Sequence, residues 1–117
     1  MVTVDTRDSY RLAHWWAEQL DGTLSAYGDN GALDPESPDS QGAFFIVTAP
    51  DGVTLGFQQV DDPTEGKNKL HLDFKCADRM AEADKLVAAG ATLQYEMQWW
   101  LTLADPDGNL FCVTDLE

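Results

Sequence analysis

Apolar and polar residues alternate in Val2–Asp5 and again, about 70 positions later, in Leu70–Phe74. This alternation is typical of a strand with one buried face. Each run leads to an aspartate, Asp8 or Asp78, that precedes a stretch of helical periodicity. Because aspartate is a good N-cap, each half of the chain is predicted to begin with a strand followed by a helix.

The two predicted helices carry matching apolar stripes with the spacing i, i+3, i+4, i+7, which places one face of a helix on a core. The first stripe consists of Ala13, Trp16, Ala17 and Leu20. The second consists of Ala83, Leu86, Val87 and Gly90. We expect the glycine at the end of the second stripe to stop that helix.

Both halves end with an apolar strand, a Pro-Asp-Gly turn and a second strand. The turns lie at Pro50–Gly52 and Pro106–Gly108. Equivalent positions are 70 residues apart at Asp8 and Asp78 but 56 apart at the turns, so the first half carries 14 extra residues (70 minus 56). These extra residues fall in the polar segment Gly28–Gln41, which predicts a loop.

The sequence therefore predicts two copies of a βαβββ module. The predicted strands are 1–6, 23–27, 43–49, 53–60, 69–76, 92–97, 99–104 and 109–115. We predict a single α+β domain over 1–117, with module one at 1–60, a linker at 61–68 and module two at 69–117.

Composition narrows the class of protein. A chain of 117 residues with 44% apolar content can close one core. It shows no apolar run as long as a membrane span and no signal peptide, so we expect a cytoplasmic protein without a membrane partner. Two cysteines, Cys76 and Cys112, are too few for a disulfide framework, and we expect both to be thiols.

The charge balance is strongly acidic, with 21 acidic and 7 basic residues and a formal net charge of −14. Such a surface repels phosphate backbones, so we expect no nucleic-acid partner. Two interpretations of the charge stay open: general solubility, or the steering of a cationic small molecule.

The second half also carries a family resemblance. Leu70–Phe74 resembles the strand that opens the second module of the vicinal oxygen chelate superfamily, and Ala104–Cys112 resembles its closing hairpin. That superfamily contains glyoxalase I, ring-cleaving dioxygenases and bleomycin-resistance proteins. Leu55–Gln58 and Lys67–Asp73 are most similar to its small bacterial glyoxalase-like domains. The resemblance implies two pseudo-symmetric modules around a curved, half-barrel cleft, and a homodimer, while leaving the chemistry open.

The resemblance also implies where a metal would bind. Metal-dependent members use a histidine on the first strand of each module and a glutamate on the last; the equivalent positions here are Met1, Gly56, His71 and Cys112. Glycine offers no side-chain ligand, and a thioether is a weak one for zinc, nickel or iron. We therefore expect no tightly bound metal and no cofactor, which disfavours lactoylglutathione lyase and dioxygenase activities.

Strand alternation selects the residues that face the cleft. If Leu72 and Phe74 face the helix, His71 and Asp73 face the cleft. His71 is either a structural imidazole bonded to a neighbour or a general base. The same rule on the equivalent first strand gives Asp5, and counting from the turns gives Gln58 and Cys112, with Leu110 and Thr114 flanking Cys112 on the same face. Together with Thr102, Asp5, Gln58 and Cys112 are the ligand-binding candidates on these strands. Cys112 would be a nucleophile only beside a basic group, and none is adjacent in the sequence.

Aromatic residues complete the predicted cleft. Trp99 and Trp100 point to opposite faces of their strand, and parity with Thr102 places Trp100 on the cleft side. Phe44 occupies the matching place in module one. Two aromatic walls and an acidic surface would suit a flat or cationic ligand. Burial of these rings at a module or dimer interface is the alternative.

Two functions of different classes follow. The first is a metal-independent small-molecule binding or sequestering protein of the glyoxalase/bleomycin-resistance type. The second is a metal-free lyase or isomerase with His71 as acid/base and Asp73 as its orienting carboxylate. We favour binding, because it needs only a complementary cleft. We expect His71, Asp73, Trp100 and Cys112 to open onto one pocket between the two modules.

Overall fold

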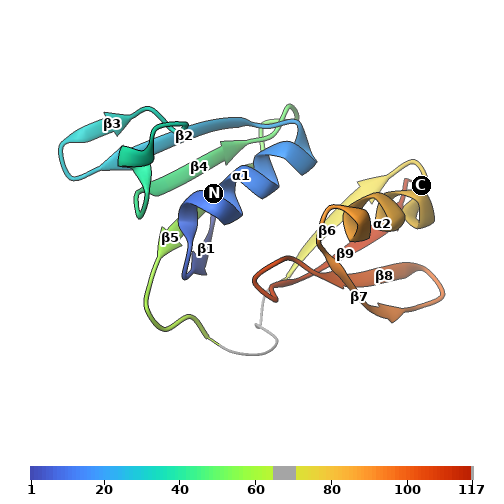
Figure 1. The fold of residues 1–117 in the computed structure, drawn as a ribbon. Coiled ribbons are helices and arrows are strands. Elements are labelled where there is room, and N and C mark those ends of the chain that lie inside the picture. Colours follow the sequence, from blue (N-terminus) through green and yellow to red (C-terminus); the bar gives the residue numbers. More distant parts are fainter. Residues whose placement is uncertain (65–70, 117) are drawn as a thin grey trace. The chain divides into compact units, whose positions relative to one another are not determined.

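A computed structural model describes residues 1–64 and 71–116 of the chain. The chain folds into two compact units, Met1–Thr64 and Glu65–Glu117. In each unit one helix packs on one face of a small sheet (Figure 1). The predicted α+β class is confirmed. Among the described residues, no helix has the length and apolar character needed to cross a membrane.

Unit one contains a five-stranded sheet with the order β1-β5-β4-β2-β3. Its elements are β1 (Val2–Thr6), α1 (Ser9–Leu20), β2 (Thr23–Gly28), β3 (Gly31–Leu33), a 3-10 helix (Pro38–Ser40), β4 (Phe44–Thr48) and β5 (Thr54–Gln59). β1 pairs parallel with β5, and the other pairs are antiparallel. The helix α1 covers β4 and β5, where Phe45 and Phe57 are fully buried.

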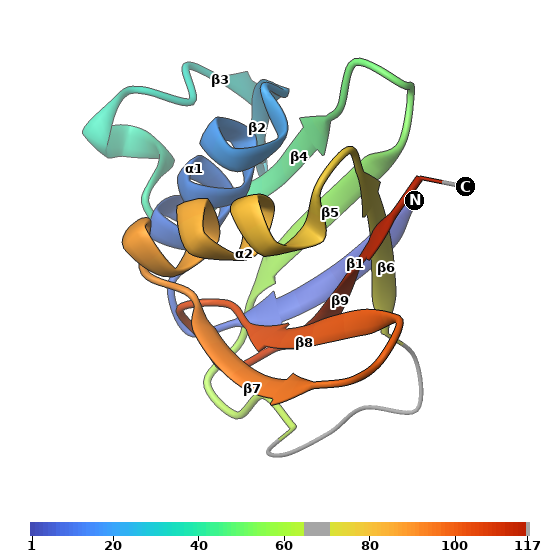
Figure 2. The ribbon, with the colours of Figure 1, turned by 90° about the vertical axis from the view of Figure 1, so that its right-hand side faces the viewer.

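Unit two repeats this plan with a four-stranded sheet in the order β6-β9-β8-β7 (Figure 2). Its elements are β6 (Leu72–Cys76), α2 (Arg79–Ala88), β7 (Thr92–Glu96), β8 (Trp100–Ala104) and β9 (Leu110–Asp115). The first strand again pairs parallel with the last, and the other pairs are antiparallel. The tandem βαβββ repeat is confirmed, since β6, β9, β8 and β7 match β1, β5, β4 and β2. Positions 69–70 of the predicted strand and 65–68 of the predicted linker lie outside the described residues.

Local sequence signals set the start of both helices and the end of α2 as predicted. Asp8 and Asp78 are the N-caps: the Asp8 carboxylate accepts a hydrogen bond from the main-chain N–H of Arg11, and the Asp78 carboxylate accepts from those of Met80 and Ala81. Gly90 follows the C-cap of α2 with φ of 117°, a conformation that favours glycine.

The buried face of α1 is rotated from the predicted stripe. Leu12 is fully buried and Trp16 is 4% exposed, whereas Ala17 and Leu20 are only half-buried. In α2, Val87 is 45% exposed although it belongs to the predicted stripe. Periodicity gives the existence of an apolar face, but the strands beneath the helix decide which residues at its margins are covered.

The predicted loop at residues 28–41 is also wrong in part. β3 pairs antiparallel with β2, and Gly31, with φ of 113°, lies at the reversal between them. A 3-10 helix follows at Pro38–Ser40. The polar, glycine-rich composition that predicted a loop therefore belongs partly to a hairpin, whose turn needs the same residue types.

Candidate functional site

Three strands of unit two present one continuous face. Parallel pairing of β6 with β9 places Asp73 opposite Cys112. Antiparallel pairing of β8 with β9 places Thr102 opposite Cys112 and Trp100 opposite Thr114. Because directly paired residues project to the same side of a sheet, these side chains share one face.

The alternation predicted for these strands is observed. On β6, Asp73 and Lys75 are exposed, whereas Leu72 and Phe74 are half-buried on the other side. On β8, Leu101 is 1% exposed and belongs to the core. The polar side chains therefore face away from the core of this unit, as expected.

This face holds a pocket of about 340 Å³. The residues that line it are His71, Asp73, Trp100, Thr102, Leu110, Phe111, Cys112 and Thr114. All four residues predicted to share a pocket are among them. The predicted location between the modules stays a prediction, because every lining residue comes from unit two.

Leu110 and Thr114 also line the pocket, as strand alternation predicts. They lie two positions before and after Cys112, so their side chains share its face. Phe111 could not be found in this way, because alternation assigns its side chain to the core. Its ring is 2% exposed and packs edge-to-face on Phe74, with ring centroids 5.9 Å apart.

The polar centre of the pocket is formed by His71, Asp73 and Cys112. Nε2 of His71 lies 3.4 Å from Oδ1 of Asp73. One donor atom from each of the three side chains lies within 4.8 Å of the others. Cys112 is 8% exposed, and its Sγ lies 3.4 Å from Oγ1 of Thr102. The His71 and Asp73 side chains are 42% and 59% exposed, so solvent screens their pairing.

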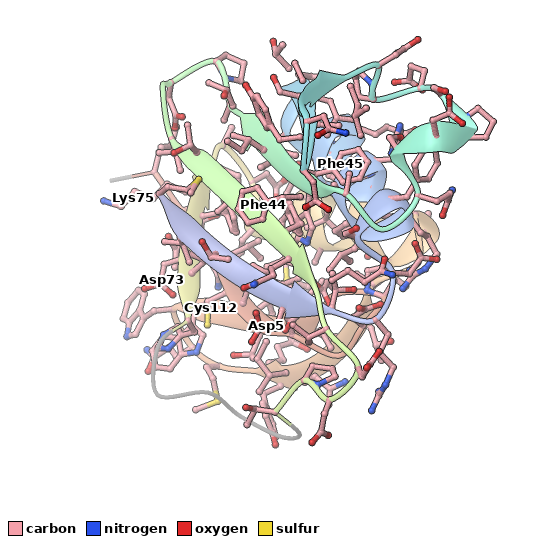
Figure 3. The ribbon with its side chains drawn as sticks, turned by 90° about the vertical axis from the view of Figure 1, so that its left-hand side faces the viewer. Asp5, Phe44, Phe45, Asp73, Lys75 and Cys112 are labelled. Atoms are coloured by element: carbon pink, nitrogen blue, oxygen red, sulfur yellow. The ribbon has the colours of Figure 1, made fainter. Side chains whose placement is uncertain are left out.

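The positions that would hold the metal of the family do not fit one in unit one. An ideal Cβ on Gly56 would lie 2.7 Å from Cζ of Phe44 and 3.2 Å from both Sδ of Met1 and Oγ1 of Thr3. The space that a glutamate side chain would need is therefore filled by the Phe44 ring and its neighbours. Figure 3 labels this ring.

In unit two, His71, Asp73 and Cys112 each offer a donor atom, and Asp73 is not one of the ligand positions that the family resemblance implies. Zinc bonds of about 2.0–2.3 Å imply donors about 3.3–3.8 Å apart in a tetrahedral site. The separations here reach 4.8 Å, which is too wide for one ion without side-chain movement. We derive no chemistry through a metal.

The candidates of module one lie on the face of their sheet that is turned away from α1. Asp5 on β1 is paired with Gln58 on β5, so the two side chains project together. In unit one, Gly56 is paired with Ile46, and Phe44 lies two positions before Ile46. In unit two, Cys112 is paired with Thr102, and Trp100 lies two positions before Thr102. Phe44 and Trp100 are thus equivalent, as predicted. Roles for Asp5, Phe44 and Gln58 in binding a ligand stay predictions.

The chain belongs to the glyoxalase-like domain family, whose family model matches residues 1–114. Structures with the same fold come from the glyoxalase/bleomycin resistance/dioxygenase group, the vicinal oxygen chelate superfamily. A comparison with curated protein sequences finds no significant match.

Three solved structures illustrate this similarity. A glyoxalase/bleomycin resistance protein/dioxygenase family enzyme from Burkholderia phytofirmans PsJN is 23% identical, with 99% of this chain and 96% of that chain covered and a TM-score of 0.65. TnmS3, an antibiotic binding protein from Streptomyces sp. CB03234, is 18% identical, with coverages of 98% and 92% and a TM-score of 0.63. FosX, a fosfomycin resistance protein from Listeria monocytogenes, is 13% identical, with coverages of 99% and 88% and a TM-score of 0.72. At these identities the likeness shows the fold.

Proposed function

We propose that this protein binds or sequesters a small molecule in the unit-two pocket without the help of a metal ion. The pocket itself carries the proposal. Its volume of about 340 Å³ lies within the range of small-molecule sites, about 300–1,000 Å³. Its lining combines apolar side chains with a few polar groups, which is the composition of sites that hold a ligand by contact area and orient it by hydrogen bonds.

The chemistry of the lining favours a flat ligand with positive charge. The Trp100 side chain contributes to the pocket and is 37% exposed, so one ring can stack on a ligand. The carboxylate of Asp73 and the net charge of −14 favour a cation. The fold supports this proposal too, since a structure that shares it, TnmS3, is described as an antibiotic binding protein.

A thermal-shift screen of cationic aromatic compounds tests the proposal, because a ligand at 100 times its dissociation constant adds about 2.7 kcal/mol to the free energy of unfolding. Compounds that shift the wild type are then titrated calorimetrically. Trp100→Ala should weaken binding by about 2 kcal/mol or more, roughly 30-fold. The matched control is Trp99→Ala, since this neighbouring ring is 68% exposed and is not part of the pocket lining. Equal effects of the two substitutions would contradict the assignment of the pocket.

The second candidate function is a metal-free lyase or isomerase. The observation that favours it is the 3.4 Å approach of His71 Nε2 to Asp73 Oδ1, since a carboxylate beside an imidazole orients an acid/base group. Compounds that bind are incubated with the protein and followed by NMR. If the protein is an enzyme, His71→Ala abolishes turnover while the fold and most of the binding are retained. If it only binds its ligand, no compound is converted.

We also propose a cytoplasmic homodimer. β7 is an edge strand of its sheet, and it carries exposed apolar side chains, with Leu93 44% and Tyr95 60% exposed. Exposed apolar surface of this kind is typical of protein interfaces. Light scattering of the purified chain measures the mass, and a monomer at micromolar concentration would contradict this proposal.

A further inference from the structure

The thiol of Cys112 lies at the centre of the face that forms the pocket. Cys112 is paired with Asp73 of β6 on one side and with Thr102 of β8 on the other. The side chain lines the pocket, although the residue is only 8% exposed. A molecule held in the pocket therefore lies against a sulfur atom that is otherwise shielded by the protein.

A base stands beside this thiol. Nε2 of His71 faces Oδ1 of Asp73 at 3.4 Å. A carboxylate can only accept a hydrogen bond, so its position favours the tautomer in which Nε2 carries the hydrogen. In the neutral ring the lone pair is then on Nδ1 and can take a proton. One ring nitrogen of His71, one carboxylate oxygen of Asp73 and Sγ of Cys112 lie within 4.8 Å of one another. A bridging water, or a small movement of the exposed imidazole, would therefore connect the base to the thiol. Thiol, base and orienting carboxylate are the parts of an activated nucleophile.

The other cysteine has different surroundings, in which the charged groups acting on it among the described residues are carboxylates. Cys76 lies on the helix side of β6, and its Sγ donates a hydrogen bond to the main-chain oxygen of Thr114 at 3.3 Å. Burial, together with the charges of Glu82 and Asp115, raises the pKa of the Cys76 thiol. Because the thiolate is the reactive form, the chain contains its own slow reference thiol.

The neighbours of Cys112 select the class of electrophile. Oγ1 of Thr102 lies 3.4 Å from Sγ, close enough for its hydroxyl to donate to an oxygen that becomes negative during attack. The exposed ring of Trp100 on the same face favours a flat, conjugated molecule. We propose that Cys112 captures α,β-unsaturated carbonyl compounds covalently in this pocket. The proposal rests on the binding function above and deepens it.

The capture is a conjugate addition and needs no other reactant. His71 takes the thiol proton, and sulfur forms a bond to the β-carbon of the ligand. The electron pair of the carbon–carbon double bond moves toward the carbonyl oxygen, which the Thr102 hydroxyl stabilises as the enolate. His71 then returns the proton to the α-carbon, so the product has the summed mass of protein and ligand.

The test uses N-phenylmaleimide, an aromatic compound of this class with a planar maleimide ring, on the full chain, with peptide mass spectrometry to follow Cys112 and Cys76 separately. Cys112 is expected to react at least about tenfold faster than Cys76, whose pKa is raised by burial and by neighbouring carboxylates. Its rate should saturate with maleimide concentration, because binding precedes the addition, whereas the rate of Cys76 rises linearly. A Cys112 rate equal to that of Cys76 would overturn the proposal.

A histidine substitution tests whether Cys112 reacts because His71 activates its thiol or only because the compound can reach it. His71→Gln is expected to slow the alkylation of Cys112 by about 100-fold, within the range that a positioned base contributes. The matched control is His14→Gln, because the only other histidine of the chain lies on α1 in unit one. Circular dichroism and thermal unfolding verify that both variants are folded. An unchanged Cys112 rate in His71→Gln would also overturn the proposal.

Failure of the capture and failure of the binding function give different results. The Cys112→Ala variant cannot be alkylated at this site but keeps the rest of the pocket. If the thiol is inert and this variant still binds cationic aromatics from the screen, the capture is wrong and the binding function stands. If the thiol is inert and no compound binds either protein, both are wrong.

Discussion

The ring of Phe44 fills the space above Gly56, since a Cβ on Gly56 would lie 2.7 Å from Cζ of Phe44. Figure 3 shows this ring in front of the ribbon of β5. The equivalent pair in unit two is Trp100 and Cys112, and both of these residues line the pocket. The same two positions of the repeat thus hold a packed ring in one unit and part of a pocket in the other.

The contact between Phe44 and Gly56 can be tested by overpacking. Gly56→Ala should lower the free energy of unfolding by about 1–3 kcal/mol, because the added methyl group meets the ring and the strand cannot move away from its two neighbours. Urea denaturation measures the change. In the double variant with Phe44→Leu, the smaller side chain should remove part of the penalty. Additive effects of the two substitutions would contradict the contact.

Metal content gives the second prediction. Protein purified without chelators should hold far less than one equivalent of zinc, nickel or iron by elemental analysis, because Gly56 provides no ligand and the three donors of unit two would have to move to surround one ion. The thermal stability should be unchanged by a chelator. A stoichiometric metal that is lost in a Cys112→Ala variant would show that side-chain movement closes the site around the ion.

The third prediction concerns acid stability. The main-chain N–H of Arg79 donates to Oδ1 of Asp115 at 2.8 Å, and the guanidinium of Arg79 pairs with the other oxygen. The main-chain hydrogen bond, then the guanidinium, hold the pKa of Asp115 below its ordinary value of 3.8. The stabilisation is therefore complete above the unfolded-state pKa and is lost as the pH falls through the lower pKa of the folded state.

Replacing Asp115 should make the free energy of unfolding less dependent on pH in the acid range. The unfolding free energy of the wild type should fall more steeply between about pH 4 and pH 2 than that of Asp115→Asn, measured by urea denaturation at each pH. Arg79→Met is the control. It keeps the main-chain N–H that donates to Asp115, so its unfolding free energy should retain part of the wild-type dependence on pH. Parallel curves for the wild type and Asp115→Asn would contradict the assignment.

The fourth prediction concerns the turn that closes unit two. Asp105 is 3% exposed, and its Oδ1 accepts hydrogen bonds from the main-chain N–H groups of Asp107 at 3.0 Å and Asn109 at 2.9 Å. Asp105→Ala should cost about 2 kcal/mol or more of unfolding free energy, because these donors lose a charged acceptor. Asp51→Ala in the other turn should cost less, since that exposed carboxylate accepts from Val53 N–H at 3.0 Å at the surface. Equal losses in urea denaturation would contradict this account.

Local signals predicted much of the fold and part of the candidate site. Caps at Asp8 and Asp78 depend only on neighbouring residues, and the side to which Asp73 points depends only on its own strand. The burial of Leu12 on α1 was not predicted from the sequence. Whether a residue at the margin of an apolar stripe is buried depends on the strands that the helix packs against. The hairpin in residues 28–41 was missed because turn residues occur in loops and hairpins alike.

The sequence by itself determined the repeat, the alternating faces of the strands and the equivalence of Phe44 and Trp100, since all of these follow from spacing along the chain. Only the tertiary structure decided that Cys112 is paired with Asp73 and lies near His71, and that Phe44 fills the space above Gly56. Alternation fixes the direction of a side chain within its strand. Contacts between distant segments depend on which strands pair and in what register, and this is set by the packing of the whole unit.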